Sequence, residues 1–308
     1  MPPVCIIPFI MSSPPTPDTP ISAAALAAMG RTPAPFWLAL DGESGDAATV
    51  RCAETVRALP GKRLVCRGTW QQQPVYVKVY FGRDRHWQVE RRGLQVLHER
   101  NIAAAALLHA GTADAGALHI LILAEIAPAE TLAQAWQQAG DATTRERLLK
   151  LALLTLAQHH RAGLEQRDIH LNNFLLASGQ LVTLDGGGIH VSGKAELSEQ
   201  ASRENLARFF AQFYPRHDAL VDALLPGYRA HRGWDETRLP TAGMLARIKH
   251  YRRERQRQYL KKIFRDCSAF ICERHWRSVR ICDRSLSSPA LQALLADPDA
   301  SLQLSSAR

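Results

Sequence analysis

The chain has 308 residues, of which 46% are hydrophobic and 22% are charged. These proportions exclude a wholly disordered chain. No hydrophobic stretch is long enough to span a bilayer, because the best candidates, Ala103–Leu108 and Leu118–Ala124, are short. The net charge of +9 favours an anionic partner, which could be a nucleotide, a nucleic acid, a phosphorylated glycolipid or a membrane surface.

The first residues, MPPVCIIPFIMSSPPTPDTP, combine a short hydrophobic run with a stretch rich in Pro, Ser and Thr. No basic residue precedes the hydrophobic run, so a signal peptide is not expected. A stretch of this composition cannot bury enough hydrophobic surface to pay for its ordering, and we expect residues 1–34 to be disordered.

The sequence contains six cysteines: Cys5, Cys52, Cys66, Cys267, Cys272 and Cys282. None of them forms a CxxC pair, and their spacing is not that of a zinc site. A chain of this size does not depend on disulfides for its stability, so we expect reduced thiols and a cytoplasmic location.

The next part of the chain predicts an antiparallel sheet with one helix. Strand-like alternation, broken by turns, gives four predicted strands: Thr49–Arg57, Leu64–Trp70, Val75–Tyr80 and Leu118–Ile126. Arg85–Arg100 has the pattern of a helix, and Ala103–Leu108 is interpreted as a buried turn region. We place a first domain, the sheet with its helix, at residues 35–126.

The remainder predicts mostly helices: Thr131–Gln138, Thr144–Arg161, Leu197–Tyr214, Ala219–Arg232 and Met244–Phe264. Two short strands, Leu175–Leu176 and Leu181–Leu184, lie between the second and the third. We place a helical domain at residues 127–266 and an extension without an assigned role at residues 267–308. The expected fold class is α+β, in which a short connector joins a small antiparallel-sheet lobe to a larger helical lobe.

Lys78 lies in the middle of the hydrophobic strand Val75–Tyr80. An ammonium group there is costly unless it has an anionic partner. In kinases a Lys–Glu ion pair positions the ATP phosphates, and Glu90 in the following helix is the natural candidate for the pair. The competing interpretation is a lysine on an edge strand and a glutamate on the surface.

Arg167–Phe174 (RDIHLNNF) is the most informative segment. Asp168 and Asn173 are separated as in the catalytic loop of kinases, where the Asp accepts the proton of the attacking hydroxyl and the Asn holds a metal ion. Phosphoryl transfer needs a carboxylate for that proton and hard oxygen ligands for magnesium.

Asp185 follows a hydrophobic strand and precedes three glycines, in VTLDGGGI. Glycines allow close approach of the backbone to a ligand, so we interpret Asp185 as a magnesium ligand that bridges to ATP phosphates. A plain hairpin turn is the alternative, because Asp-Gly is a common turn sequence.

Two further positions complete the predicted nucleotide site. Gly61, in the turn between the first two predicted strands, could cover the phosphates with backbone N–H groups, although it lacks a GxGxxG pattern. Ile126, in the predicted connector, could offer backbone groups to adenine; this assignment depends on position alone.

Taken together, these segments resemble the lipopolysaccharide kinase family, the Kdo and heptose kinases of the bacterial inner core, within the protein-kinase-like superfamily. The resemblance covers roughly Leu59 to Asp266, and DIHLNNFLL with LDGG is its most specific part. It implies the following roles: Lys78 on the ATP phosphates with Glu90 as its partner, Asp168 as the catalytic base, and Asn173 and Asp185 on Mg²⁺. His170 matches a histidine often present in sugar and antibiotic kinases, and its alternative role is hydrogen bonding within the loop. Gln166 replaces the first residue of the kinase H-R-D motif.

The acceptor is expected to be a sugar rather than a protein. The predicted helix near Leu197 follows Asp185 closely and no A-P-E element is present, which leaves no activation segment for a peptide. The basic segment Arg247–Arg265 could complement the phosphates of a core glycolipid or the anionic surface of the inner membrane. Its alternative is a solvated amphipathic helix with five residues packed inward: Ile248, Tyr251, Tyr259, Leu260 and Ile263.

The favoured hypothesis is therefore an ATP- and Mg²⁺-dependent kinase of a heptose or Kdo residue in the lipopolysaccharide core. Such an enzyme would be cytoplasmic or peripheral on the inner membrane, without a nucleic-acid partner or a second subunit. Two alternatives stay open: another small-molecule kinase of the aminoglycoside-phosphotransferase type, and a non-catalytic binding protein with a kinase fold.

Overall fold

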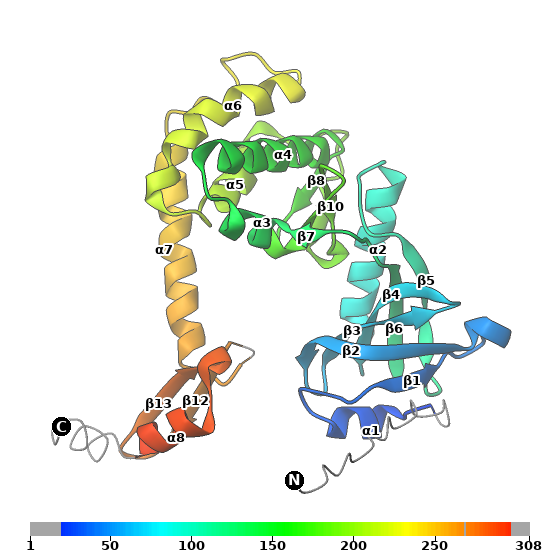
Figure 1. Cartoon of the computed structure of the whole chain (residues 1–308). Helices are drawn as coiled ribbons and strands as arrows, with labels where there is room; N and C mark the ends of the chain where they lie inside the picture. Colours follow the sequence, from blue (N-terminus) through cyan, green and yellow to red (C-terminus); the bar gives the residue numbers. More distant parts are fainter. Residues whose placement is uncertain (1–19, 268, 297–308) are drawn as a thin grey trace, which may run out of the picture. The chain divides into compact units, whose positions relative to one another are not determined.

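The structure is a computed structural model that describes residues 20–267 and 269–296. The chain packs as two compact units (Figure 1). The sheet unit is Met1–Asp84 with Leu108–Glu125, and the helical unit is Arg85–Leu107 with Ile126–Arg308. The helix after the first four strands thus belongs to the helical unit. The finer domain boundaries expected from the sequence stay predictions.

The sheet unit contains a six-stranded sheet with the strand order β1-β2-β3-β4-β6-β5. Its strands are β1 (Phe36–Ala39), β2 (Thr49–Leu59), β3 (Arg63–Trp70), β4 (Gln73–Phe81), β5 (Leu107–Ala113) and β6 (Leu118–Ala124). The neighbours from β1 to β6 pair antiparallel, and one short turn of 3₁₀ helix, η1 (Gly45–Ala47), lies between β1 and β2. The predicted strands β2, β3, β4 and β6 are present. β1 and β5 were not predicted.

Alternating β-branched residues hold this sheet together. In β4, Val75, Val77 and Val79 are fully buried, and they share their core with Ile120 and Ile122 of β6. The branched side chains pack well on a pleated surface, and one face of the sheet takes all of them. β5 has no such alternation, because its sequence LLHAGTA contains a histidine, a glycine and a threonine and most of its residues are only half-buried.

A short helix, α1 (Ala23–Ala28), lies within the segment that we expected to be disordered up to residue 34. The Ser22 side chain caps it by accepting a hydrogen bond from the Ala25 N–H, and Leu26 is buried in the core of the sheet unit. One anchored leucine thus orders a segment whose composition gave no such signal. Residues 1–19 lie outside the described part of the chain.

The helical unit begins with α2 (Arg85–Glu99) and continues after the sheet with α3 (Leu132–Gln138) and α4 (Ala142–Arg161). Its later helices are α5 (Glu199–Phe210), α6 (Ala219–His231), α7 (Met244–Ile263) and α8 (Pro289–Ala296). All five predicted helices after residue 126 are present; α5 is shorter than predicted at both ends, and α6 and α7 each end one residue earlier. The predicted α+β class, with a small antiparallel sheet and a larger helical part, is confirmed.

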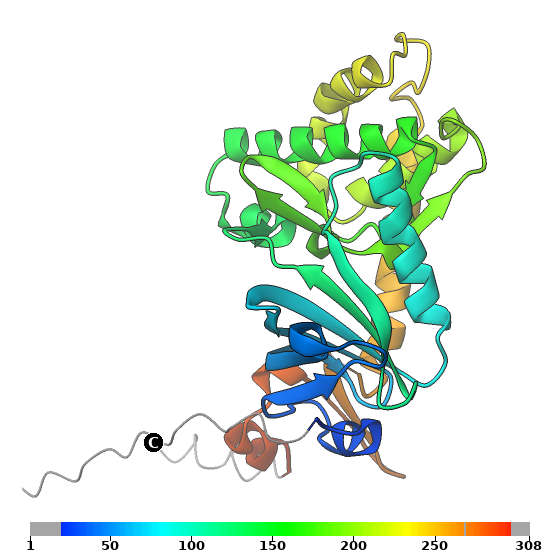
Figure 2. The same cartoon turned by 90° about the vertical axis from the view of Figure 1, so that its right-hand side faces the viewer.

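Short strands and single turns connect these helices. They are β7 (Glu130–Thr131), β8 (Leu164–Gln166), η2 (Leu171–Asn173), β9 (Phe174–Ala177), β10 (Gln180–Thr183), η3 (Gly186–Gly188), β11 (Ile189–Val191), η4 (Pro215–His217), β12 (Phe270–Arg274), β13 (Val279–Asp283) and η5 (Arg284–Leu286). They form three small sheets, β10-β9-β7, β11-β8 and β12-β13. Figure 2 shows α4, the long green helix, running alongside the β9–β10 hairpin.

No helix in the described part of the chain is long and hydrophobic enough to cross a membrane. Five cysteines fall within that part, and all five are free thiols: Cys52, Cys66, Cys267, Cys272 and Cys282. Cys5 lies outside the described residues.

Two adjacent histidines at the end of α4 are fully buried. His159 Nε2 lies 3.1 Å from Thr183 Oγ1, and burial lowers the pKa of His159 to about 4. Burial also lowers the pKa of His160 to about 3. The neutral His160 donates from Nε2 to Asn205 Oδ1 at 3.0 Å, and its Nδ1 accepts from the Tyr228 hydroxyl at 2.6 Å. The two imidazoles therefore tie α4 to β10, α5 and α6 in their uncharged form.

This arrangement predicts that acid destabilises the helical unit. Unfolded histidines bind protons below about pH 6.5, whereas the folded protein holds His159 and His160 neutral down to about pH 4 and 3. The free energy of unfolding should fall as the pH drops below 6.5, by up to ~1.4 kcal/mol per pH unit for each histidine. Urea unfolding midpoints between pH 7.5 and 5 measure this slope.

A His160→Gln variant should show a shallower slope, even if it is less stable at every pH. His250→Gln is the comparison variant, because His250 is exposed on α7, where it faces Glu254 at 3.7 Å, and its loss should change the slope less than the loss of His160 does. Equal slopes in wild type and His160→Gln would contradict the assignment.

Candidate functional site

The predicted catalytic loop is a tight turn between β8 and β9. The backbone oxygen of Asp168 accepts two hydrogen bonds, one from the Asn173 Nδ2 at 2.7 Å and one from the His170 N–H at 2.9 Å. The Asn173 N–H in turn donates to His170 O at 2.9 Å. The loop thereby brings Asp168 and Asn173 together, as the sequence spacing predicts, and its closure uses the backbone of Asp168 rather than its carboxylate.

The carboxylate of Asp168 is exposed to solvent and contacts one neighbouring side chain. Its side chain is 53% exposed, and Oδ1 lies 3.2 Å from His170 Nε2. An exposed carboxylate that is held on one side by an imidazole can accept a proton from an approaching hydroxyl with its other oxygen.

Gln212 holds the same loop from the other side. This residue, just after α5, donates from Nε2 to Ile169 O at 2.5 Å and accepts from the Leu171 N–H at 3.3 Å. It thus binds the backbone on both sides of His170. No role was predicted for Gln212, because one amide among helical residues gives no signal of a loop contact.

Asp185 follows β10 and is joined directly to the catalytic loop. The Leu184 N–H donates to Asn173 O at 2.9 Å, so the residue before Asp185 is bonded to the predicted metal ligand. The carboxylate caps η3, because its Oδ1 accepts from the Gly187 N–H at 2.8 Å. The three predicted residues Asp168, Asn173 and Asp185 therefore belong to one hydrogen-bonded assembly in the helical unit.

The strand before Asp185 is fixed at Thr183. Its N–H donates to Ala103 O at 2.9 Å, and its carbonyl accepts from the Ala105 N–H at 3.1 Å. The segment between α2 and β5, which we expected to be a buried turn region, therefore forms a parallel bridge to β10 through Ala104.

The first glycine after Asp185 is required by a close backbone contact with α2. A Cβ on Gly186 would lie 2.4 Å from Glu90 O, and a Cβ on Gly93 would lie 1.9 Å from Gly186 O. Real Cβ atoms do not approach backbone atoms so closely, so both positions need glycine. The glycine run was predicted to let the backbone approach a ligand, and this stays a prediction. The structure adds a packing reason for Gly186 and a second required glycine, Gly93, which was not predicted.

Glu90 is buried in this contact between α2 and η3, with only 1% of its surface exposed. The interpretation of Glu90 as a surface residue is therefore wrong. Its place in the helical unit puts it in the same unit as Asp185.

Lys78 lies in the sheet unit, on β4, between Val65 of β3 and Leu121 of β6. β4 is an interior strand, so the interpretation of Lys78 as a residue of an edge strand is also wrong. The pairing of Lys78 with Glu90 stays a prediction.

The remaining predicted positions have simple local explanations. Gly61 lies in the β2–β3 turn with φ +65°, a conformation that favours glycine, and a Cβ there would meet no atom within 4 Å. Ile126 is the first residue of the helical unit after β6. Their contacts with a nucleotide stay predictions.

The oxygen donors of the assembly suit magnesium. Asn173 uses its Nδ2 within the loop, which leaves its amide oxygen as an acceptor, and Asp185 uses one carboxylate oxygen on Gly187. In the described part of the chain, no group of three or more His, Cys, Asp or Glu side chains could hold a metal ion. Magnesium does not need such a cage, because it usually binds one or two carboxylates together with water and substrate phosphates.

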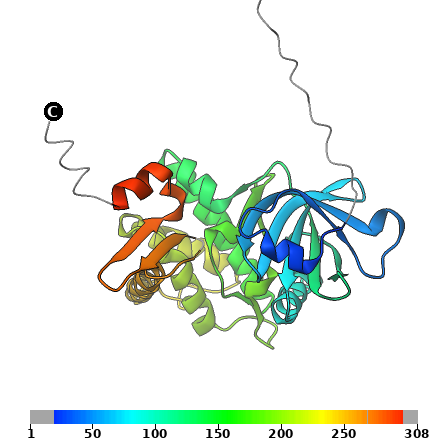
Figure 3. The same ribbon diagram turned by 90° about the horizontal axis from the view of Figure 1, so that it is seen from below.

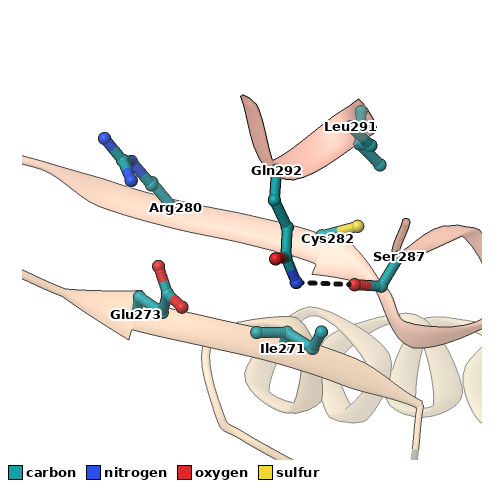
Figure 4. Close-up of a pocket in the computed structure, with 7 residues that line it drawn as sticks. All are labelled: Ile271, Glu273, Arg280, Cys282, Ser287, Leu291 and Gln292. Carbon is teal, nitrogen blue, oxygen red and sulfur yellow. Dashed lines mark hydrogen bonds between the residues drawn. The ribbon is translucent and has the colours of Figure 1, made fainter. Parts of the chain in front are cut away.

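A pocket of about 210 Å³ lies elsewhere, between α8 and the β12–β13 hairpin (Figure 4). Its lining comprises Ile271, Glu273, Arg280, Cys282, Ser287, Leu291 and Gln292. Gln292 Nε2 donates to Ser287 Oγ at 3.3 Å across one side. This pocket contributes no residue to the predicted site.

Comparison with known proteins adds a likeness to solved structures. No protein-family model matches the chain, and no curated protein matches it. Among solved structures, the chain is similar to one described as WaaP in complex with acyl carrier protein. The sequences are 21% identical with a TM-score of 0.46, and the match covers 65% of this chain and 87% of that chain. A likeness this low carries no functional argument, so any proposed chemistry must depend on this chain's own residues.

Proposed function

We propose that this chain is an ATP-dependent phosphotransferase that phosphorylates a sugar hydroxyl. The observation that carries the proposal is the assembly of Asp168, Asn173 and Asp185, joined by the hydrogen bond from Leu184 N–H to Asn173 O. A carboxylate open to solvent beside two hard-oxygen ligands is the set of groups that phosphoryl transfer requires.

Each residue has a separate task in this proposal. Asp168 accepts the proton of the sugar hydroxyl, and His170 at 3.2 Å orients its carboxylate. Asn173 and Asp185 would hold Mg²⁺, which when bound neutralises negative charge on the phosphates. Lys78 would bind phosphate oxygens, with Glu90 as its ion-pair partner.

The short segment after Asp185 supports a sugar acceptor. η3 and β11 follow Asp185 directly, and α5 begins at Glu199. A protein substrate would need a longer segment for docking. We propose a heptose or Kdo residue of the lipopolysaccharide inner core, phosphorylated at the cytoplasmic surface of the inner membrane. The exposed Lys249 and Arg253 on α7 would complement phosphates of such a glycolipid.

Removal of metal tests the proposal. The chain should transfer label from γ-labelled ATP to dephosphorylated core oligosaccharide in the presence of Mg²⁺. EDTA should reduce the transfer to background, and excess Mg²⁺ should restore it, because the proposed ligand oxygens cannot neutralise the phosphates.

Aminoglycosides and a buffer blank, assayed in parallel, separate the alternatives. Transfer to an aminoglycoside instead would favour an antibiotic kinase, and no turnover with any acceptor would favour a non-catalytic binding protein. Mass spectrometry of core oligosaccharide from a deletion strain should then show one missing phosphate on a single sugar.

A further inference from the structure

The β12–β13 hairpin ends in a tip formed by Trp276 and Arg277. The His275 N–H donates to Ser278 O at 2.8 Å, which closes the turn around them. Trp276 is 88% exposed, and the guanidinium carbon of Arg277 lies 4.9 Å from its ring centroid. A tryptophan so exposed contributes little to any core, so the fold does not explain it.

The tip lies beyond the C-terminal end of α7. At the start of β12, the rings of Phe270 and Tyr259 are 5.5 Å apart, and at its end Arg274 Nη2 donates to Phe264 O at 2.9 Å. The strand therefore runs in the direction of α7, and its turn follows the last turn of that helix. Figure 3 shows β12 and β13 (orange) with α8 (red) beside α7.

The end of α7, like the hairpin tip, exposes large hydrophobic side chains and cations. Phe264 is 50% exposed and Leu260 is 49% exposed, and the cations Lys261 and Arg265 are exposed beside them. The expectation that Leu260 packs inward is therefore wrong; Tyr259, 54% exposed, also departs from it. We call the following six residues the hairpin-tip patch: Leu260, Lys261, Phe264, Arg265, Trp276 and Arg277.

The cations of this patch differ from those at the start of α7. Arg252 forms an ion pair with Asp218 at 2.5 Å, and Arg247 pairs with Glu204, so these arginines fix the helix to its neighbours. Within residues 20–267 and 269–296, no carboxylate pairs with Lys261, Arg265 or Arg277. Among the described residues, no acidic side chain neutralises these three charges.

We propose that the hairpin-tip patch docks on the surface of an anionic phospholipid bilayer. Tryptophan favours the membrane–water interface, where its ring is buried and its N–H stays near water. Cations close to an anionic membrane add ~1 kcal/mol each. A projecting tip with one exposed tryptophan and one cation, together with a helix end that exposes two further hydrophobic side chains and two cations, combines both contributions.

Single-stranded nucleic acid fits this surface less well. Such partners lie in a basic groove lined by several aromatic residues, on which successive bases stack. Here one tryptophan projects from a two-residue turn.

The inference gives the proposed function its membrane partner, but it can fail or succeed independently, because its test uses no nucleotide. The full chain is mixed with vesicles of phosphatidylglycerol and phosphatidylcholine, and with vesicles of phosphatidylcholine alone. Sedimentation should recover the chain only with anionic vesicles. Lipids with brominated chains should quench a part of the tryptophan fluorescence that is missing in Trp276→Phe.

Trp276→Ala should weaken partitioning about tenfold, and Arg277→Gln about fivefold, the factor that corresponds to ~1 kcal/mol for one cation. Both variants should keep the wild-type unfolding midpoint. Tyr214→Ala is the matched control, because Tyr214 is 70% exposed and Arg216 lies 5.0 Å over its ring. Its binding should be unchanged.

Three results would overturn the proposal. The first is an equal loss in Tyr214→Ala, and the second is unchanged vesicle binding in Trp276→Ala. The third is binding to single-stranded RNA that depends on Trp276 without any binding to vesicles.

Discussion

Replacement of Asp168 by Asn is expected to lower kcat by roughly 10²–10⁴-fold, the range that a positioned general base contributes. The substitution keeps the shape of the side chain but removes its capacity to accept a proton. The loop hydrogen bonds use the backbone oxygen of Asp168, so the fold of the loop should not change. Because Asp168 is not a proposed phosphate ligand, KM for ATP should change little.

Steady-state kinetics with ATP and the core oligosaccharide measure both constants. Asp222→Asn on α6 is the control, because Asp222 is exposed and has no proposed part in the chemistry. Asp185→Asn should behave differently from Asp168→Asn, since it should also raise the Mg²⁺ concentration needed for half-maximal activity. A loss of less than tenfold in Asp168→Asn would place the base elsewhere.

Replacement of Gly93 by Ala is expected to destabilise the protein by about 3 kcal/mol or more. The new Cβ would lie 1.9 Å from Gly186 O, and a backbone atom cannot move aside as a side-chain end can. Relief requires that α2 and η3 separate, which would also displace Asp185. Urea unfolding should therefore show a lower midpoint, and phosphoryl transfer should fall with it.

Gly227→Ala provides a control of opposite sign. Gly227 also lies inside a helix, α6, but a Cβ there would meet no atom within 4 Å. Alanine should stabilise that helix by about 0.5–1 kcal/mol, because glycine loses more backbone freedom on folding. If both variants were neutral, the close approach of α2 to the glycine loop would be disproved.

Much of the fold could be predicted because hydrophobic periodicity is a local property. The alternation of Val75, Val77 and Val79 identifies β4, and the pattern of α4 identifies a buried helix. The spacing of Asp168 and Asn173 could also be predicted to serve one site, because a single turn brings them together.

What could not be predicted depends on contacts between distant segments. The helix α1 packs into the core through Leu26, which the local sequence does not reveal. The need for glycine at position 93 follows from the backbone oxygen of Gly186, which lies next to it in the folded chain. Residues 103–108 were interpreted as a turn because their pairing partner is Thr183, far along the chain. The exposure of a side chain also depends on distant segments, so the sequence gives no sign that Trp276 is exposed.

The two hydrogen bonds by which the Gln212 amide holds the catalytic loop make that loop sensitive to deamidation. The amide offers one donor and one acceptor to two backbone groups of opposite polarity, Ile169 O and Leu171 N–H. A carboxylate at this position would have the same outline but would direct an oxygen at Ile169 O. Deamidation of Gln212 would therefore place a carboxylate oxygen against the carbonyl oxygen of Ile169, two acceptors without a proton between them. The loop that carries Asp168 would then lose its conformation in an aged sample, while the helices stay folded.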